Sequence, residues 1–206
     1  VDLSGINLTN VELRKVTFRN VQFDSAILER THLDECTLEH VKLNKAICNS
    51  LKSTGSRLLD FSALDCQFEK AVFRGGDFQR VCIQDSDFKS AEFSQLSISD
   101  SRLEELNFTS GTVQGVSCIG SSFLRTFFKH GKIRHCVFTD CQLEEVDMES
   151  ARLTAVDFDN TNLSYADFSR AKIDRSNFLN CDAGWTVFAG ANLGFCTVSK
   201  GRFSDA

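Results

Sequence analysis

Apolar side chains recur along the chain with a period of five residues. Written in fives from Val1, the chain reads VDLSG INLTN VELRK VTFRN VQFDS, and this frame holds to the C-terminus. The third residue of each five is apolar at every position except Ser53, and it is mostly Leu, Phe or Ile. The first residue is mostly small: Val, Ala, Cys, Ser, Thr or Gly.

Charged residues avoid both of these positions. All Lys, Arg, Asp, Glu and His residues lie on the second, fourth and fifth positions. A helix needs a period near 3.6 residues and a strand a period of 2, so neither explains the pattern. A coil that turns a corner after every five residues explains it, because two side chains then point inward and three outward. Four such sides close one coil, and we expect about ten coils to stack at the ~4.8 Å spacing of β-strands.

The repeated motif is similar to that of a known family. The fives ADFSR at 166–170 and ANLGF at 191–195 match A-[D/N]-[L/F]-x-x, the consensus of the pentapeptide-repeat family, and VDFDN at 156–160 matches it except for Val in place of Ala. The resemblance covers essentially the whole chain. It implies an all-β fold, a right-handed quadrilateral parallel β-helix (a solenoid), as a single domain over residues 1–206. It indicates little about function, because one fold hosts many functions.

Composition agrees with a backbone that is almost entirely hydrogen-bonded in ladders. The chain contains no Pro, which cannot donate to a ladder. No signal peptide and no apolar run of ~18 residues is present, so we expect no membrane span. The chain begins with Val1 and shows no polar cap at either end, although solenoids need caps. Either it is a fragment of a longer chain, or two rods stack end to end.

Two segments depart from the pattern of large and small residues. In LKSTG SRLLD FSALD, at 51–65, Leu51 and Phe61 take small positions while Ser53 and Ala63 take large ones. Either the coil exchanges volumes here, or the segment forms a protruding loop. In CDAGW, at 181–185, Ala183 replaces the large residue.

Cysteine placement predicts buried free thiols. Eight of the nine cysteines lie on inward positions, and only Cys82 lies on an outward one. Free Cys behaves as a small apolar residue, and an odd count disfavours a disulfide framework, so we expect a reducing compartment, the cytoplasm. His130 and His135 stand near Cys136 and Cys141, but the frame points the cysteines inward and the histidines outward. We therefore predict no metal and no cofactor.

No pattern predicts catalysis. The chain has no Gly-rich phosphate loop, no H-E-x-x-H and no nucleophile elbow, so we expect that it is not an enzyme. Two pairs of acidic residues, Glu104–Glu105 and Glu144–Glu145, are expected to be outward and solvated, and they define a candidate acidic face.

Residues twenty apart should share a side of the rod, which allows a charge map. We name each side after its first large residue: the Leu3, Leu8, Leu13 and Phe18 sides. Their outward residues sum to −5, −1, +4 and −3, matching the net charge of −5. The positive charges of the Leu13 side gather in its later coils, at Lys132, Arg134, Arg152, Lys172 and Arg175. With a negative net charge, we interpret this cluster as solvated and consider direct nucleic-acid binding disfavoured.

The charge map also bears on an activity that the family resemblance suggests. Several members of that family protect type II topoisomerases by imitating B-DNA. Such a mimic needs acidic surface along its length, whereas here an acidic side lies opposite a basic one. A DNA-mimicking gyrase binder that gives protection from inhibitors therefore stands as the alternative function.

Outward aromatic residues near the C-terminus form a candidate partner patch. Tyr165 and Trp185 share a column on the Leu3 side, and Phe195 is outward at the same end. Exposed aromatic residues are typical interface anchors. Either this patch binds a protein partner or a second copy, or it packs on a capping segment or a further domain. We predict a non-catalytic protein-interaction or scaffold module that presents a rigid surface.

Overall fold

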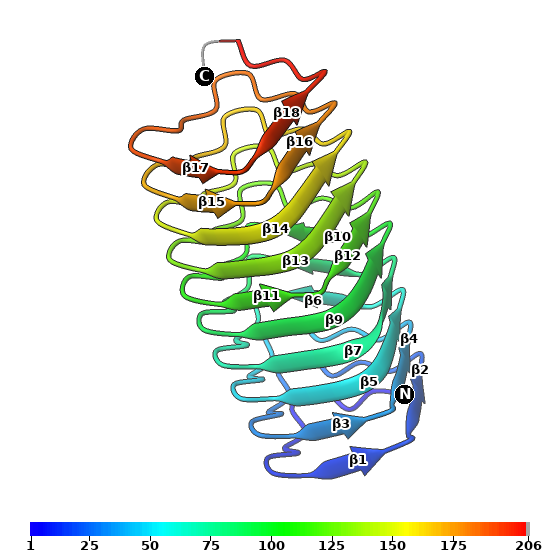
Figure 1. Ribbon diagram of the computed structural model, residues 1–206. Helices are drawn as coiled ribbons and strands as arrows, with labels where there is room; N and C mark the ends of the chain where they lie inside the picture. The colour runs from blue at the N-terminus through cyan, green and yellow to red at the C-terminus, as the bar shows by residue number, and fades with distance from the viewer. Residues whose placement is uncertain (205–206) are drawn as a thin grey trace.

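The chain winds into a rod of stacked coils with the two termini at opposite ends (Figure 1). The computed structural model describes residues 1–204, and these form only strands, bridges and turns. Every pairing is parallel and joins residues twenty apart, from Asp2–Gln22 to Asp182–Arg202. The fold is the right-handed quadrilateral β-helix that the resemblance of the repeated motif implies, and its coils have the four sides that the five-residue period predicts.

The Leu13 and Phe18 sides carry most of the strands, and they face the viewer in Figure 1. Strands confined to the Leu13 side are β1 (Glu12–Arg14), β3 (His32–Asp34), β11 (Thr112–Gln114), β15 (Lys172–Asp174) and β17 (Asn192–Gly194). Those on the Phe18 side are β2 (Thr17–Arg19), β4 (Thr37–Glu39), β12 (Ser117–Ile119), β16 (Asn177–Leu179) and β18 (Thr197–Ser199). Five longer strands run across both sides: β5 (Lys52–Leu59), β7 (Val72–Gln79), β9 (Glu92–Ser99), β13 (Lys132–Thr139) and β14 (Arg152–Asp159).

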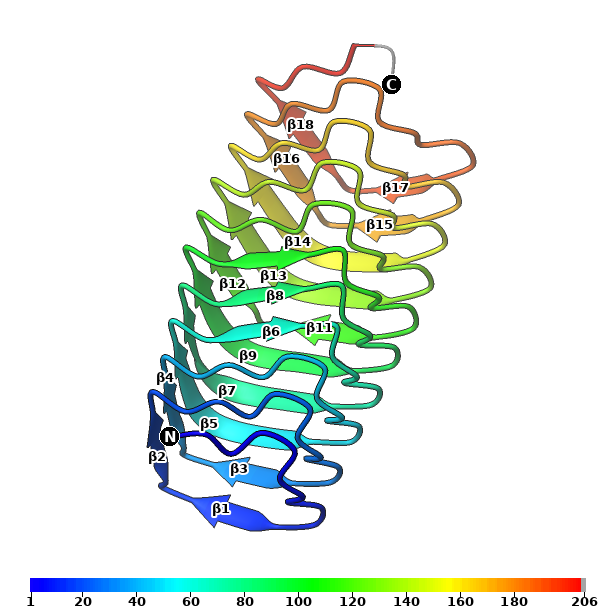
Figure 2. The ribbon, with the colours of Figure 1, turned by 180° about the vertical axis from the view of Figure 1, so that it is seen from behind.

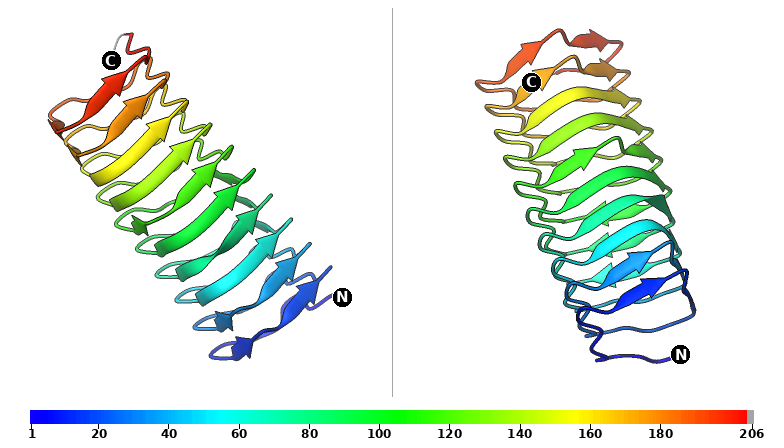
Figure 3. Two further views of the ribbon diagram at one scale, coloured as in Figure 1. Left: turned by 45° about the vertical axis from the view of Figure 1, so that its right-hand side comes forward. Right: turned by 60° about the horizontal axis from the view of Figure 1, so that its bottom comes forward.

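The Leu3 and Leu8 sides are built mainly from bridges and tight turns. Of these two sides, the Leu3 side alone has strands among the described residues: β6 (Ser62–Leu64), β8 (Cys82–Gln84) and β10 (Arg102–Glu104). β8 pairs with both β6 and β10. Figure 2 shows β6 and β8 on the opposite side of the rod from β5, β7 and β9. Seen obliquely in Figure 3, each coil returns above its starting point. The Leu3 and Leu13 sides therefore point in opposite directions.

The corners depend on a left-handed backbone at the fifth residue of each five. From Gly5 to Lys200 every fifth residue has a positive φ, including 60° at both Tyr165 and Trp185. At the end of most Leu3 and Leu8 sides this closes a β-turn, as where Ala166 donates its N–H to the Leu163 carbonyl at 3.0 Å. A positive φ at the third turn residue identifies type II geometry.

The side chains of Asp and Asn at the second position accept a hydrogen bond from a backbone N–H group of the same turns. The side-chain oxygen of Asn162 accepts the N–H of Ser164 at 3.0 Å, and Asp167 does the same for Ser169 at 2.7 Å. Without this bond the fourth-position N–H in a turn needs water or a side chain of the neighbouring coil, as where Asn44 donates its N–H to Asp24 at 2.9 Å. The preference of the motif for Asp or Asn thus follows from the turn.

Stacked aromatic rings fill the axis of the upper and middle coils. Phe88, fully buried, stacks on Phe68 with ring centroids 4.6 Å apart and on Phe108 at 4.8 Å. A second stack joins Phe138, Phe158 and Phe178 at 5.3 and 5.1 Å. Large third-position residues therefore meet their equivalents one coil away, which fixes the register of the stack.

Residues 51–65 stay within the coil rather than forming a loop. Leu51 and Phe61 are buried in small positions, and Ser53 and Ala63 are buried in large ones. The volume exchange is thus the correct interpretation. The axis is not completely filled, because an apolar cavity of about 30 Å³ is lined by residues between Leu8 and Ile83, among them Leu51, Ser53, Leu58 and Phe61.

Filling this cavity should stabilise the rod. We expect Ser53→Val to raise the free energy of unfolding by about 0.7 kcal/mol, the value for this volume at ~24 cal/mol per Å³. Urea unfolding of the variant and the parent measures the difference. Ala71→Val is the control, because Ala71 is fully buried and lies outside the cavity lining, so added volume there should destabilise. Equal effects of the two changes would contradict the assignment of a void at Ser53.

Polar side-chain atoms at the small positions inside the rod form hydrogen bonds with backbone groups. The Thr126 hydroxyl donates to the Leu103 carbonyl at 2.9 Å, and the Cys36 thiol contacts the Leu13 carbonyl at 3.3 Å. Among residues 1–204 no buried side-chain nitrogen or oxygen lacks a partner. This explains why Ser, Thr and Cys share the small position with Ala and Val. The same residues include no helix of the length and hydropathy needed to cross a membrane.

Candidate interaction surface

Two exposed aromatic residues lie one above the other on the Leu3 side. Tyr165 and Trp185 are each 56% exposed, at the same corner of successive coils. Hydrogen bonds hold their backbones in place, since Tyr165 donates to the Gly184 carbonyl at 2.9 Å and Trp185 to the Ser204 carbonyl at 3.0 Å. A left-handed φ is unfavourable for bulky residues. The backbone of this edge is therefore held in place, and the two side chains are left largely in solvent.

Phe195 is part of a different surface. It is 90% exposed, but it follows β17 on the Leu13 side, opposite Tyr165 and Trp185. The candidate partner patch is thus divided between two sides of the rod, although its three residues lie at the same end. All four sides repeat the same five-residue frame, so a residue can be assigned to its side only from its place within the twenty-residue coil.

Glu144 and Glu145 give the aromatic edge a negative charge. Glu145 is exposed and lies in the column of Tyr165, one coil below it. Neither glutamate belongs to any ion pair formed among residues 1–204. We name the column of Glu145, Tyr165 and Trp185 the acidic–aromatic column.

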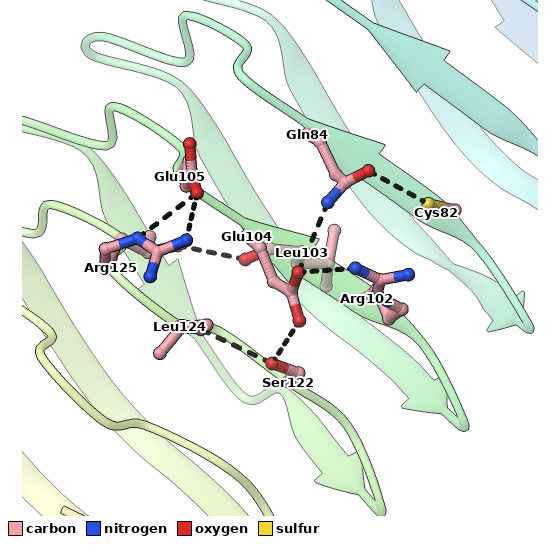
Figure 4. A network of polar contacts seen from close by, with 10 residues as sticks. Cys82, Gln84, Arg102, Leu103, Glu104, Glu105, Ser122, Leu124 and Arg125 are labelled. Carbon is pink, nitrogen blue, oxygen red and sulfur yellow. Dashed lines mark hydrogen bonds and ion pairs between the residues drawn. The ribbon is translucent and has the colours of Figure 1, made fainter. Parts of the chain in front are cut away.

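Glu104 is buried, which corrects the expectation that this pair is outward and solvated. Its side chain is only 12% exposed. Arg102 donates to Oε2 at 2.9 Å, Gln84 donates to the same oxygen at 3.2 Å, and the Ser122 hydroxyl donates to Oε1 at 2.6 Å (Figure 4). Gln84 and Ser122, on the two neighbouring coils, cover the carboxylate and donate hydrogen bonds to its oxygens, which allows it to be buried.

Burial and hydrogen bonding act in opposite directions on the Glu104 carboxyl. Burial alone raises its pKa, but the bonds from Arg102, Ser122 and Gln84 outweigh burial, so the pKa lies below its usual value. Glu105 stays nearer the solvent, where the Arg125 guanidinium lowers the pKa of its carboxyl. Both acidic groups of this pair are therefore neutralised by arginine.

Glu104→Gln should weaken the fold in a pH-dependent way. A folded pKa below the unfolded value stabilises above about pH 4.3 and loses that effect as the pH falls through the folded pKa. We expect a loss of roughly 1–2 kcal/mol at neutral pH, for weakened bonds to a charged group. The difference from the parent should shrink in acid, as denaturant unfolding across pH would show. Glu105→Gln is the exposed control, and an equally large effect there would contradict the role of burial.

A ladder of positive charges occupies the Leu13 side. Lys132, Arg152 and Lys172 occupy the same register position on the adjacent strands β13, β14 and β15. All three side chains are exposed. In the described part of the chain none of them forms an ion pair, although Arg175 contacts Asp174 at 2.9 Å. We name Lys132, Arg152 and Lys172 the cationic column.

The cysteines next to the histidines are enclosed. Cys136 and Cys141 are fully buried, and their thiols contact backbone carbonyls, at 3.1 Å to Arg134 and 3.3 Å to Thr139. Burial raises the pKa of Cys141 to about 11. His130 and His135 lie at exposed corners. The thiols are therefore protonated at neutral pH and held away from the imidazoles.

A shallow groove lies where the Phe18 side meets the Leu3 side. It has a volume of about 380 Å³ and is lined by Asp140, Gln142, Asn160, Thr161, Asn162, Asn180 and Asp182. The amide of Asn160 donates to Asp140 at 2.6 Å. The two carboxylates stand two coils apart, ~10 Å at the spacing of parallel strands, which is too far to share one ion.

Solved structures with the same fold are very dissimilar in sequence. HetL, a pentapeptide repeat protein involved in heterocyst differentiation regulation from the cyanobacterium Nostoc sp. strain PCC 7120, aligns with a TM-score of 0.83 at 16% identity, covering 95% of this chain and 88% of that one. Trypsin-treated QnrB1, a plasmid-mediated fluoroquinolone resistance protein, aligns with a TM-score of 0.65 at 15% identity, covering 96% and 92%. These likenesses concern the fold alone. Among curated proteins, none matches.

Family models match both halves of the chain. Pentapeptide repeats, in eight copies, match residues 2–39, and the pentapeptide repeat region matches residues 117–188 and 133–205. Together they span more than half of the sequence, and the segment between them has the same twenty-residue register in the structure. The chain belongs to the pentapeptide repeat family.

Proposed function

We propose that this protein is a non-catalytic interaction or scaffold module that binds a protein partner through the Leu3 side of its C-terminal coils. The observation that carries this proposal is the acidic–aromatic column, with Tyr165 and Trp185 each more than half exposed on a rigid edge. Aromatic residues of this kind contribute large contact areas at little cost in conformational entropy. Their fixed backbone means that little ordering is needed on binding.

The interior offers no room for a substrate. Its cavity of about 30 Å³ compares with the ~300–1,000 Å³ of ligand pockets, and its lining is almost wholly apolar. The polar groove has the volume for a small molecule, but its lining includes no His, Cys, Lys or Arg. These features support a binding role rather than a catalytic one. The buried free thiols support the proposal that the protein works in the reducing cytoplasm.

Comparative capture from cell extract tests the proposal. Immobilised parent protein should retain a specific protein that Trp185→Ala loses, because truncating an anchor commonly weakens binding by more than tenfold, about 2 kcal/mol. Leu64→Ala is the matched control, since Leu64 is 44% exposed on the same side several coils lower. Retention of the same proteins by all three forms would defeat the assignment of the site. The melting temperature of each form establishes that the fold is intact.

The alternative is a DNA-mimicking binder of gyrase, and its support is likeness of fold to QnrB1. The charge distribution disfavours it. Glu104 and Glu105 are paired with arginines, and the cationic column lies on the opposite side. We therefore expect no protection in a gyrase supercoiling assay with a fluoroquinolone. Protection that depends on Glu144 and Glu145 would place the alternative first.

A further inference from the structure

The cationic column is a feature that the rod does not need for its own fold. Lys132, Arg152 and Lys172 stand directly above one another, and like charges in register across strands destabilise a sheet. In the first coil the cations of the same side are compensated, since Arg14 contacts Asp34 at 2.7 Å and Lys15 contacts Glu35 at 3.3 Å. Such an uncompensated ladder indicates a surface that meets negative charge.

The matching negative charge lies on the opposite side of the same coils. In these coils the outward residues of the Leu3 side sum to −3 over 141–145, 161–165 and 181–185, and those of the Leu13 side to +4 over 131–135, 151–155 and 171–175. Glu145 lies in the chain between Lys132 and Arg152, so the two columns occupy the same levels along the rod. The acidic–aromatic column therefore offers one carboxylate and two aromatic rings to the three cations of the cationic column.

The path of the coil also aligns the two columns laterally. The chain runs in opposite directions on opposite sides, so the fifth position of the Leu3 side and the second position of the Leu13 side both border the Leu8 side. A second rod displaced sideways without rotation would thus place Glu145, Tyr165 and Trp185 against Lys132, Arg152 and Lys172. At the other edge, Phe195 would meet the column of Asn162 and Asp182.

We infer that the protein associates with itself side by side, the acidic–aromatic column of one copy lying on the cationic column of the next. The inference rests on the proposed function and names a second copy as the partner. Glu145 forms an ion pair with a guanidinium or ammonium group, and the rings of Tyr165 and Trp185 receive the others through cation–π contacts. Because the joined surfaces differ, each copy keeps one of them free, and the assembly grows in rows.

Sedimentation velocity across protein concentration tests this inference. The parent should show larger species as concentration rises, and these should dissociate when NaCl is raised from about 0.05 to about 0.5 M, where the screening length falls from about 14 to about 4 Å. The triple reversal Lys132→Glu, Arg152→Glu and Lys172→Glu should weaken association by at least about tenfold, as should Glu144→Lys with Glu145→Lys. An equimolar mixture of the two variants should associate again, because each supplies the surface that the other lacks.

The control is Lys52→Glu, a cation of the same column several coils lower that forms no ion pair among residues 1–204. At its level the facing column holds Lys45 and Asp65, whose charges cancel, so association should stay unchanged. A parent that stays monomeric at low salt, reversal variants that associate like the parent, or a mixture that fails to associate would each overturn the inference. Retention of a monomeric parent on heparin, lost in the triple reversal, would also overturn it, by assigning the ladder to another polyanion. If self-association fails while Trp185-dependent capture of another protein persists, the proposed function stands and the inference that the partner is a second copy is wrong.

Discussion

Gly76→Ala is expected to destabilise the rod by about 3 kcal/mol or more, the combined cost of backbone strain and overpacking. Gly76 has a φ of 120°, which side-chain-bearing residues rarely adopt. A Cβ there would lie 2.2 Å from the Ser56 carbonyl oxygen. That oxygen belongs to the backbone of β5, whose register with β7 fixes it. Relief therefore requires two coils to separate.

Gly75 provides the control one residue away. Its φ of 60° suits Asn, and the nearest atom to an added Cβ is 3.9 Å away. Gly75→Asn should therefore change the free energy of unfolding by no more than ~0.5 kcal/mol. Chemical unfolding of the two variants measures the contrast. If Gly76→Ala is as stable as Gly75→Asn, the close approach of β5 and β7 at this corner is not as described.

The interior was predictable because one rule acts on every residue there. Two inward positions in five must be apolar and must fit the neighbours above and below, so the period and the volume exchange at 51–65 both appear in the sequence. Even the exception at Ser53 leaves only a small cavity. Corners were predicted, but their left-handed backbone was not. Residues such as Tyr165 and Trp185 rarely adopt a left-handed conformation, so their presence at the fifth position does not indicate one.

The outside was less predictable, as two equivalent glutamates show. Glu104 in SRLEE and Glu144 in CQLEE hold the same position on the same side, yet Glu104 is buried and Glu144 is not. The difference lies in their neighbours. Arg102 reaches Glu104 along its own strand and Ser122 reaches it from the next coil. Side-chain pairing along one strand and between neighbouring coils decides this, and the five-residue period contains no information about it.

Phe88→Ala is expected to cost about 3–5 kcal/mol, because it leaves a cavity in the middle of the aromatic stack. Phe88 is fully buried and contacts Phe68 and Phe108 face to face and Phe93 edge to face at 5.6 Å. The coils above and below cannot close the gap without breaking their ladder of backbone bonds. Phe88→Leu keeps most of the volume and should cost only about 1–1.5 kcal/mol.

Because each coil contacts only its neighbours, the damage from Phe88→Ala should be local. Hydrogen exchange should show amides between residues 68 and 108 losing protection first, while the upper coils around the fully buried Phe158 keep theirs. Phe127→Ala is the control, since Phe127 lies on the same side of the rod but is 44% exposed, and it should change stability by no more than ~0.5 kcal/mol. If the two alanine variants unfold at the same denaturant concentration, then the stacked rings do not hold the coils together, and the ladder of backbone bonds alone carries the rod.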